Sequence, residues 1–399
     1  MKVAVMGYGT IGSGVVEVLE VNKEIIAKRV GEPLELKYVL DLHNFEGDPI
    51  ADKVVSDYQM IVNDDEVKLV VETMGGVEPA YTFVKAMLEH GKHVATSNKA
   101  LVADKGSELI RIARENNVNF LFEASVGGGI PIIRPLLRCL TGDVIEEISG
   151  IVNGTTNYMM TKMMNEGSDF DDVLKEAQAK GYAEKDPTAD IEGYDACRKI
   201  AILTSLICGA HVDYNDIPTE GITKITANDM KYAKKMGRTV KLLASSCASG
   251  NTYYARVAPF LIAPSNTLYH VNDVFNAISL HGNMLGDAMF YGSGAGKLPT
   301  ASAVVGDLVD MALHVHRNVR IAWSDEKIIL ADPMEQRYSY FVRSAADKKD
   351  IEAVFGNDLD YIDAGISGEN GFVTGEMTEK TFEEKTKQLG SMIQRIRLG

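Results

Sequence analysis

Short apolar segments alternate with helical patterns over the first 125 residues, and this alternation constrains the fold more than any other feature. Five segments rich in Val, Ile and Leu, each bounded by Gly, Asp or Asn, predict strands at Val3–Met6, Leu36–Leu40, Leu69–Val71, His93–Thr96 and Val118–Phe122. Helical patterns fill most of the gaps, at Ile11–Ile26, Tyr81–Glu89 and Glu108–Asn116. The alternation predicts an α/β fold built on a doubly wound parallel sheet.

A glycine-rich turn follows the first predicted strand and opens the first helix. Its sequence is Gly7-Tyr8-Gly9-Thr10-Ile11-Gly12, and in this context a G-x-G-x-x-G pattern predicts dinucleotide binding on a Rossmann-type sheet. Gly7 would permit the tight turn, Gly9 the approach of a pyrophosphate, and Gly12 close packing of the helix. The amides of Thr10 and Ile11 would lie at the positive end of that helix.

Asp41 ends the second predicted strand. A carboxylate there can accept hydrogen bonds from the adenosine ribose hydroxyls and would repel a 2′-phosphate, which favours NAD over NADP. An exposed Asp at a strand end is also a common turn residue. Lys37 or Lys53 could lie near a phosphate, so NADP remains an alternative.

Two more strand ends carry polar or small residues. Glu72-Thr73-Met74-Gly75-Gly76 follows the third strand and Thr96-Ser97-Asn98-Lys99 follows the fourth. Open parallel sheets bind ligands at this edge, so we expect Thr73, Met74, Gly75 and Lys99 to approach the cofactor. The alternative for Lys99 is a solvated loop lysine.

The alternation stops after Phe122, which predicts a change of domain. We expect an α+β substrate and dimerisation domain, with strands near 144–152, 253–262, 277–281 and 288–291 and helices up to about 209 and near 229–244. The C-terminal pattern predicts a small βαββα domain, whose last helix we expect at Thr381–Ile396. The expected boundaries are 1–130 with 297–320, then 131–296, then 335–399.

Asp195 and Lys199 lie four residues apart on one predicted helix face. An exposed pair of this kind would contribute only about 0.3–0.5 kcal/mol to stability. The same face continues as Ile202, Leu203 and Leu206, so the charges should point inward. A lysine that is removed from water and held by a carboxylate is suited to proton transfer, and we interpret the pair as catalytic.

Two further glycine-rich stretches are candidate binding segments. Glu123 with the stretch from Val126 to Ile130 could bind a hard cation through one carboxylate and several backbone carbonyls, with Na⁺ or K⁺ as suitable as Ca²⁺. Gly294 and Gly296 belong to a small-residue loop that could lie against a cofactor. The alternative for that loop is a plain turn into a helix.

Charge and cysteine usage limit the partners. Lys and Arg total 41 and Asp and Glu total 56, for a net charge of −15, which argues against nucleic acid and anionic membranes as partners. The 4 cysteines have no metal-ligand spacing and suggest reduced core thiols. With neither a signal-like nor a membrane-length apolar segment, we expect a cytoplasmic protein.

Seven motifs in order resemble the homoserine dehydrogenase family over about residues 1–320: GYGTIGSGV, ETMGG, TSNKAL, EASVGGGIPI, GIVNGTTNYM, GYAEKDPTADIEGYDACRK and GSGAGKLPTASAVVGD. The resemblance implies reversible hydride transfer between L-homoserine and L-aspartate 4-semialdehyde with NAD or NADP. It also implies a place in threonine, methionine and isoleucine biosynthesis.

The resemblance assigns roles to individual positions. Lys199 looks like the proton donor and acceptor for the substrate oxygen, and Lys99 looks like its companion between the domains. The positions that resemble substrate or nicotinamide contacts are Glu184, Asp195, Gly154, Thr155, Gly294 and Gly296. The family's monovalent cation site corresponds to Glu123 with the carbonyls of Val126, Gly128 and Ile130.

The C-terminal pattern resembles the ACT domain, the amino-acid-sensing module that some members of the family carry. This implies a threonine effector, although Asp347-Lys348-Lys349-Asp350 replaces the module's usual Pro-Gly turn. A module that only supports contacts in a homodimer is the alternative. Two other functions stay open for the whole chain: another NAD-dependent amino-acid or hydroxy-acid dehydrogenase, and a non-catalytic dinucleotide sensor.

Overall fold

The computed structural model describes residues 1–250 and 252–399, which form two compact units. The first contains residues 1–144, 201–214 and 290–328, and the second contains residues 145–200, 215–289 and 329–399. The expected boundaries placed 131–144 and 201–214 in the substrate domain and gave the C-terminal residues a domain of their own.

A six-stranded parallel sheet forms the centre of the first unit, with the strand order β3-β2-β1-β4-β5-β6. This is the order of a dinucleotide-binding sheet. The strands are β1 (Lys2–Met6), β2 (Glu35–Leu40), β3 (Val54–Val55), β4 (Val67–Glu72), β5 (His93–Thr96) and β6 (Phe120–Leu121). The predicted doubly wound parallel sheet is confirmed, and β3 is the strand that the pattern did not predict.

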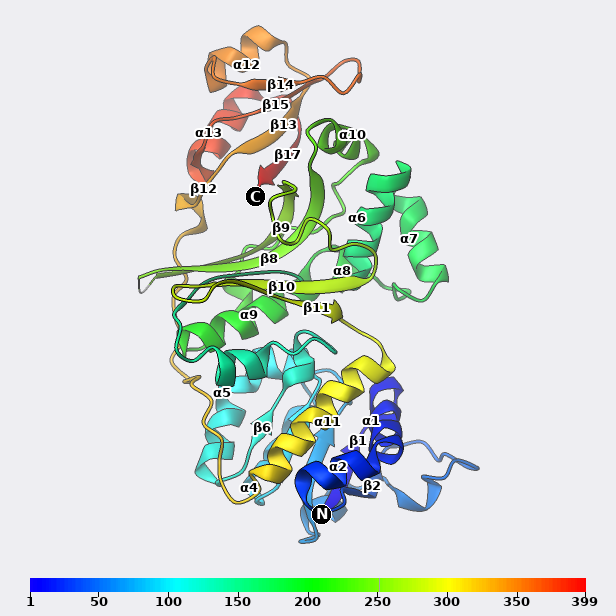
Figure 1. The fold of residues 1–399 in the computed structure, drawn as a ribbon. Helices are drawn as coiled ribbons and strands as arrows, with labels where there is room; N and C mark the ends of the chain where they lie inside the picture. Colours follow the sequence, from blue (N-terminus) through cyan, green and yellow to red (C-terminus); the bar gives the residue numbers. More distant parts are fainter. Residues whose placement is uncertain (251) are drawn as a thin grey trace. The chain divides into compact units, whose positions relative to one another are not determined.

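Helices cover both faces of this sheet, as Figure 1 shows. On one side lie α1 (Thr10–Val21), α2 (Lys23–Val30) and α11 (Lys297–Leu313), and on the other lie α4 (Ala80–Glu89) and α5 (Lys99–Glu115), while the short α3 spans Gln59–Val62. The predicted helix Ile11–Ile26 is two helices, because the backbone leaves the helical conformation at Asn22. Helix α5 begins earlier than predicted because the Asn98 side chain accepts a hydrogen bond from Leu101 N and caps it.

The second unit is organised by a nine-stranded mixed sheet with the order β11-β10-β7-β8-β9-β17-β13-β15-β14. Its first five strands in chain order are β7 (Ile145–Ile151), β8 (Thr239–Ser249), β9 (Thr252–Ile262), β10 (Phe275–Gly282) and β11 (Gly286–Ser293). The long β8–β9 hairpin is paired in register from Thr239 with Ile262 to Ser249 with Thr252.

The helices of this region are α6 (Gly154–Glu166), α7 (Phe170–Ala179), α8 (Thr188–Ile191), α9 (Tyr194–Cys208) and α10 (Ala227–Lys235). The predicted helix near 229–244 is wrong in its second half. The chain leaves α10 before Gly237, which has a φ of +64°, and then enters β8. The first residues of β8 are buried, and a short continuous apolar run does not distinguish a strand from a helix.

The C-terminal residues form a βαββαβ arrangement rather than the predicted βαββα. Its elements are β13 (Tyr340–Ser344), α12 (Lys348–Phe355), β14 (Asp360–Ile362), β15 (Asn370–Val373), α13 (Glu379–Leu389) and β17 (Met392–Leu398). Two further short strands, β12 (Arg337–Tyr338) and β16 (Met377–Thr378), pair with each other. The predicted helix Thr381–Ile396 ends early because Gly390 adopts a left-handed conformation with a φ of +67°.

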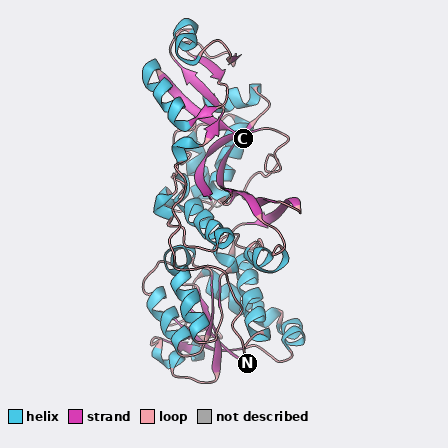
Figure 2. Cartoon of the chain, turned by 90° about the vertical axis from the view of Figure 1, so that its left-hand side faces the viewer, coloured by secondary structure: helices cyan, strands magenta, loops and turns pink. Residues whose placement is uncertain are grey.

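Helices α12 and α13 lie side by side on one face of this C-terminal sheet (Figure 2). The Tyr340 and Phe382 rings stack beneath them with centroids 3.7 Å apart. Strand β17 pairs with β13 and also, in parallel, with β9. The C-terminal module therefore continues the sheet of the second unit.

The structure contains no membrane-length helix among the residues it describes, and its cysteines differ in burial. In the described part of the chain, no helix combines the length and the apolar character needed to cross a membrane. The expectation of four core thiols is wrong for Cys139, which is exposed, whereas Cys197 is buried and Cys208 and Cys247 are partly buried.

Candidate active site

The glycine turn after β1 is tightly packed on its inner side. Gly7 has a φ of +90°, which favours glycine. A Cβ on Gly12 would lie 1.9 Å from the Gly7 carbonyl oxygen, so the start of α1 can approach the turn only with glycine at this position. The Thr73 hydroxyl, from the end of β4, donates to the same carbonyl at 2.9 Å.

The outer side of the turn is open at Gly9, the residue that precedes α1. No heavy atom of the described residues outside its immediate chain neighbours lies within 4 Å of the position that a Cβ on Gly9 would take. The first amides of α1, at Thr10 and Ile11, follow this open position. An anion could therefore approach the backbone here and meet the positive end of the helix, so the turn fits a dinucleotide pyrophosphate.

Asp41 connects the end of β2 to this turn. One carboxylate oxygen accepts a hydrogen bond from Tyr8 N at 2.9 Å, and the other accepts one from His43 N at 3.0 Å. Burial by itself would raise the pKa of Asp41, but the hydrogen bonds from His43 and Tyr8 outweigh it and lower the pKa. Lys37, one of the two lysines considered for a phosphate, instead pairs with Asp64 and Glu66.

A buried carboxylate organises the neighbouring strand ends. Glu72 accepts hydrogen bonds from Met74 N at 2.7 Å and from the Thr96 hydroxyl at 2.5 Å. Burial raises the pKa of Glu72. Asn98 donates to the Gly76 carbonyl at 2.6 Å and caps α5, whose first residue is Lys99. Neither Glu72 nor Asn98 was predicted as a site residue, although Glu72 ends β4 and Asn98 follows β5 by two residues.

Glu123 uses its carboxylate within the protein. One oxygen accepts hydrogen bonds from the amides of Ile132 and Ile133 at 2.7 and 2.8 Å, and the other accepts one from Arg134 N at 2.7 Å. Asp307 accepts hydrogen bonds from Glu123 N and from the Arg134 guanidinium. Burial raises the pKa of Asp307 to about 7, although Arg134 acts in the opposite direction. In the described residues, no three or more His, Cys, Asp or Glu side chains gather as a metal-binding group.

The predicted small-residue loop at Gly294 and Gly296 packs against the glycine stretch that follows Glu123, within the first unit. A Cβ on Gly128 would lie 2.3 Å from the Gly294 carbonyl oxygen, and Gly129 N donates to the Ser293 carbonyl at 3.1 Å. Gly296 has a φ of +112° and precedes α11. Helix α11 in turn packs on α1, where Gly14 leaves room for the Lys297 side chain.

In the second unit, Lys199 and Asp195 form a buried pair on α9. Their exposed fractions are 8% and 3%, and the Lys199 ammonium donates to Asp195 Oδ2 at 2.8 Å and to the Val152 carbonyl at 2.6 Å. The predicted inward orientation of this pair is thus the observed one. A lysine nitrogen held by one carboxylate and one carbonyl has a defined position for proton exchange.

Asn153 joins this pair to two other elements. Its amide nitrogen donates to Asp195 Oδ2 at 2.9 Å and to Asp190 Oδ1 at 2.7 Å. Its amide oxygen accepts a hydrogen bond from Thr156 N and caps α6. The sequence analysis missed Asn153 and Asp190 as site residues. The available signal was an Asn at the helix-capping position before Gly154.

The other predicted substrate residues lie on the segments beside this group. The Thr155 hydroxyl donates to the Tyr182 carbonyl at 2.5 Å. A Cβ on Gly154 would lie 2.8 Å from the Val274 carbonyl. Glu184 has an exposed side chain, and its backbone carbonyl accepts a hydrogen bond from the Gln178 amide.

A dinucleotide-binding sheet in one unit and a buried lysine–carboxylate pair in the other define the class of protein. It is an oxidoreductase that uses a nicotinamide dinucleotide. Two family models identify the particular family: "homoserine dehydrogenase, NAD binding domain" matches residues 7–123, and "homoserine dehydrogenase" matches residues 131–309. The chain belongs to the homoserine dehydrogenase family.

Individual relatives agree with this assignment. Homoserine dehydrogenase of Bacillus subtilis is 42% identical and covers 80% of this chain and 74% of its own, and that of Neisseria gonorrhoeae is 38% identical and covers 98% and 90%. The crystal structure of homoserine dehydrogenase from Thiobacillus denitrificans is similar over 100% of this chain and 98% of its own, with 34% identity and a TM-score of 0.92. A hyperthermophilic archaeal homoserine dehydrogenase, solved in complex with NADPH, covers 78% of this chain and 97% of its own with 28% identity and a TM-score of 0.66.

The geometry of the glycine turn predicts opposite outcomes for two alanine substitutions. Gly12→Ala should lower the free energy of unfolding by about 1–3 kcal/mol, because the new methyl group collides with a backbone oxygen. Gly9→Ala should leave the free energy of unfolding within about 0.5 kcal/mol of the parent protein and still weaken dinucleotide binding. Urea unfolding and NADH fluorescence titration measure the two effects. Equal NADH affinity in Gly9→Ala and the parent would contradict a pyrophosphate at this turn.

Proposed function

We propose that Lys199 is the proton donor and acceptor of this dehydrogenase, with Asp195 and Asn153 as the residues that position it. The observation that carries the proposal is the Lys199 ammonium held 2.8 Å from Asp195 and 2.6 Å from the Val152 carbonyl. In homoserine oxidation the neutral Lys199 amine takes the proton of the substrate hydroxyl and becomes an ammonium, and in aspartate semialdehyde reduction the Lys199 ammonium returns that proton to the carbonyl oxygen. A bound nicotinamide supplies or accepts the hydride.

The substrate's ammonium requires carboxylates that it can reach from solvent. Asp190 is partly exposed, and one of its oxygens is bound by Asn153. Glu184 is exposed on the segment that precedes α8. We assign Asp190 and Glu184 to the ammonium, with Gly154 and Thr155 beside them. Asp195 then serves chiefly to hold Lys199. Lys99, at the start of α5, is proposed as the companion lysine that the family resemblance implies.

Replacing Lys199 by methionine tests the proton-transfer role. Lys199→Met keeps the length of the side chain but removes the exchangeable proton, so we expect kcat to fall by about 10²-fold or more. Affinity for NADH should stay within about twofold, because the residue lies outside the dinucleotide-binding sheet. Both are measured by NADH absorbance and by fluorescence titration.

The matched control is Lys175→Met, which changes an exposed lysine of the same unit with a side-chain exposure of 77%. It should retain the parent rate. Turnover by Lys199→Met at the parent rate would eliminate the mechanism and would favour the alternative of a dinucleotide sensor in which the lysines are dispensable.

We infer a preference for NAD from Asp41. Its carboxylate is fixed beside the glycine turn by Tyr8 N and His43 N, where it can bind ribose hydroxyls and repels a 2′-phosphate. The archaeal relative was solved with NADPH, so this preference belongs to the individual sequence rather than to the family as a whole.

The Asp41→Ser variant tests this inference. Removing the charge should raise the ratio of kcat/KM for NADPH to kcat/KM for NADH by roughly tenfold. Steady-state kinetics with each cofactor in the same buffer measure this ratio. Asp52→Asn removes an exposed carboxylate from the same unit and serves as the control. An unchanged ratio in Asp41→Ser would remove Asp41 from cofactor selection.

The monovalent cation, Na⁺ or K⁺, is proposed at backbone carbonyls alone. The Glu123 carboxylate already accepts three backbone amides, which does not suit a cation ligand. The carbonyls of Val126, Gly128 and Ile130 are the remaining oxygen ligands for a weakly bound cation. No catalytic step is assigned to it.

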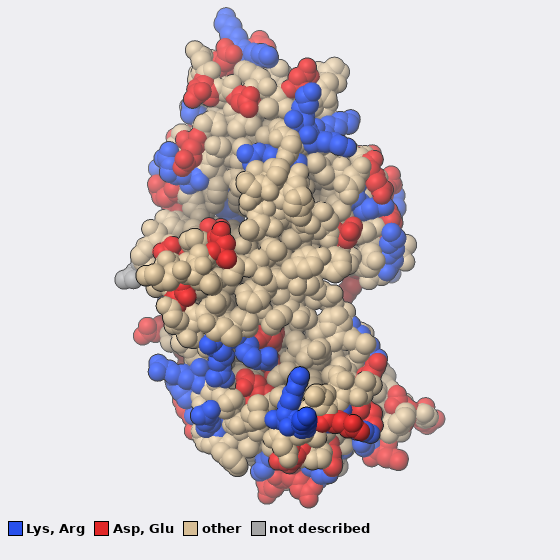
Figure 3. Space-filling view, in the orientation of Figure 1, with Lys and Arg blue, Asp and Glu red and all other residues tan. Residues whose placement is uncertain are grey.

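We also propose a homodimer formed through the second unit. Strand β11 is one of the two edge strands of the nine-stranded sheet. Large apolar side chains are exposed around it, with exposed fractions of 82% at Met284, 47% at Leu285 and 44% at Met289. Figure 3 shows a broad area of uncharged side chains over β10 and β11. A second copy of the chain would cover both the apolar side chains and the open strand edge.

We also propose that threonine is an effector of this enzyme. The βαββαβ module, which resembles an amino-acid-sensing domain, supports this proposal. L-Threonine at millimolar concentrations should raise the KM for homoserine about fivefold or more, because the module couples to the substrate site in this proposal. D-Threonine is the control, and sedimentation velocity measures the size of the particle in the same samples. Unchanged activity together with an unchanged dimer would leave the module a purely structural role.

A further inference from the structure

We propose that Glu220 is a positioning residue for the substrate site, through which the C-terminal module holds the turn before α9 in place. The proposal rests on the assignment of Asp190 and Lys199 made above. Its basis is a continuous set of contacts within the second unit, from β17 through Glu220 to the residues that carry Asp190.

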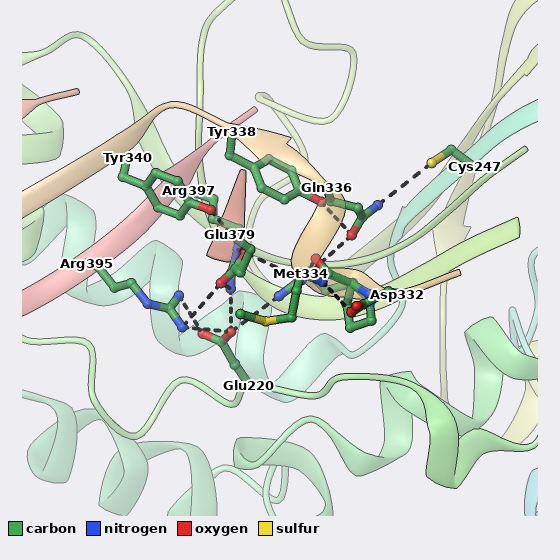
Figure 4. A network of polar contacts seen from close by, with 12 residues as sticks. Glu220, Cys247, Asp332, Met334, Gln336, Tyr338, Tyr340, Glu379, Arg395 and Arg397 are labelled. Atoms are coloured by element: carbon green, nitrogen blue, oxygen red, sulfur yellow. Dashed lines mark hydrogen bonds and ion pairs between the residues drawn. The ribbon is translucent and has the colours of Figure 1, made fainter. Parts of the chain in front are cut away.

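The first contacts are ion pairs between Glu220 and two arginines of β17 (Figure 4). Arg397 Nη2 donates to Glu220 Oε1 at 2.7 Å, and Arg395 donates to both Glu220 oxygens at 3.2 and 3.3 Å. The Arg397 side chain is only 1% exposed. Hydrogen bonds to a buried guanidinium fix the carboxylate more firmly than a surface ion pair does.

The charges in this group keep Glu220 ionised. Arg397 also binds Glu379 of α13, at 2.5 and 3.0 Å, and Arg256 of β9 lies 3.5 Å from Glu220 and 3.4 Å from Glu379. The group thus contains three arginines and two glutamates. Burial alone would raise the pKa of Glu220, but Arg397 and Arg395 lower it to about 2.

The backbone at Glu220 is fixed to the sheet. Glu220 N donates to the Val257 carbonyl of β9 at 2.8 Å, and Val257 N donates to the Pro218 carbonyl at 2.9 Å. The side chain and the backbone of Glu220 are thereby held by different strands, β17 and β9.

The next residue, Gly221, lies directly against the turn before α9. A Cβ on Gly221 would lie 2.2 Å from the Ile191 carbonyl oxygen and 2.5 Å from the Glu192 Cα. Ile222 N donates to the same Ile191 carbonyl at 2.8 Å. The segment after Glu220 therefore supports the backbone between α8 and α9 without a side chain between them.

That backbone carries the carboxylates of the site. Asp190 precedes Ile191, and its carbonyl accepts a hydrogen bond from Gly193 N at 3.0 Å. The Gly193 carbonyl in turn accepts a hydrogen bond from Cys197 N in α9 at 2.9 Å. A shift of the Glu220 segment would displace Asp190 first, whereas Lys199 remains anchored on the Val152 carbonyl. Substrate affinity should therefore change more than the rate of the chemical step.

Glu220→Gln tests the proposal because it keeps the shape of the side chain and removes the charge. The KM for homoserine should rise roughly tenfold, while kcat and the KM for NADH stay within about twofold. The matched control is Glu376→Gln, which removes an exposed carboxylate paired with Arg337 in the same module. Arg395→Gln, which removes one partner of Glu220, should also raise the KM for homoserine.

Gly221→Ala approaches the contact from its other end and does not change a charge. It should also raise the KM for homoserine, whereas Gly375→Ala should not, because open space surrounds that position. A KM for homoserine in Glu220→Gln and Gly221→Ala equal to that in the controls would overturn the inference. Equal losses for homoserine and NADH, with lower thermal stability, would show a general structural role and would also overturn it. Lys199→Met separates the two proposals, since an active Lys199→Met enzyme refutes the assigned site itself.

Discussion

The geometry of the substrate group depends on one buried side-chain amide, that of Asn153. Its oxygen caps α6 through Thr156 N at 2.9 Å, and its nitrogen binds Asp190 and Asp195 at 2.7 and 2.9 Å. An amide is the side chain that can accept from a helix end and donate to two carboxylates at once. Without it, two carboxylates would lie close together with reduced hydrogen bonding, and the position of Lys199 would no longer be defined by Asp195.

Local patterns predicted the parts of the structure that depend on local sequence. The parallel sheet follows from short apolar segments, and the inward orientation of Asp195 and Lys199 follows from helical spacing. The contacts of Asn153 with Asp190 and Asp195 span 37 and 42 residues. They arise from how α6, α8 and α9 pack, which no spacing in the sequence reveals. Glu123 illustrates the same limit, because its carboxylate binds amides that become neighbours only after the chain turns at the glycine stretch.

Two of the errors in secondary structure have the same physical cause. The first residues of β8, up to 244, and of β17, up to 396, were predicted as helix because each directly follows a helical pattern. In both cases a glycine with positive φ, Gly237 or Gly390, ends the helix, and the next residues form a strand inside the large sheet. Arg397, on the second of these strands, is almost completely buried. Its partners, Glu220 and Glu379, are distant in sequence and could not be identified from local charge patterns.

The buried arginines also explain why the C-terminal module is continuous with the substrate sheet. Removing a guanidinium from water costs several kcal/mol unless carboxylates bind it with good geometry. Arg397 has two such partners, of which Glu379 belongs to the module and Glu220 belongs to the segment after α9. If β17 separated from β9, Arg397 would lose Glu220. The guanidinium would then have Glu379 as its one remaining carboxylate partner of the two. The Glu220 carboxylate therefore stabilises the position of the module and also supports the turn before α9. A displacement of the module would consequently alter the position of the turn, and the reverse.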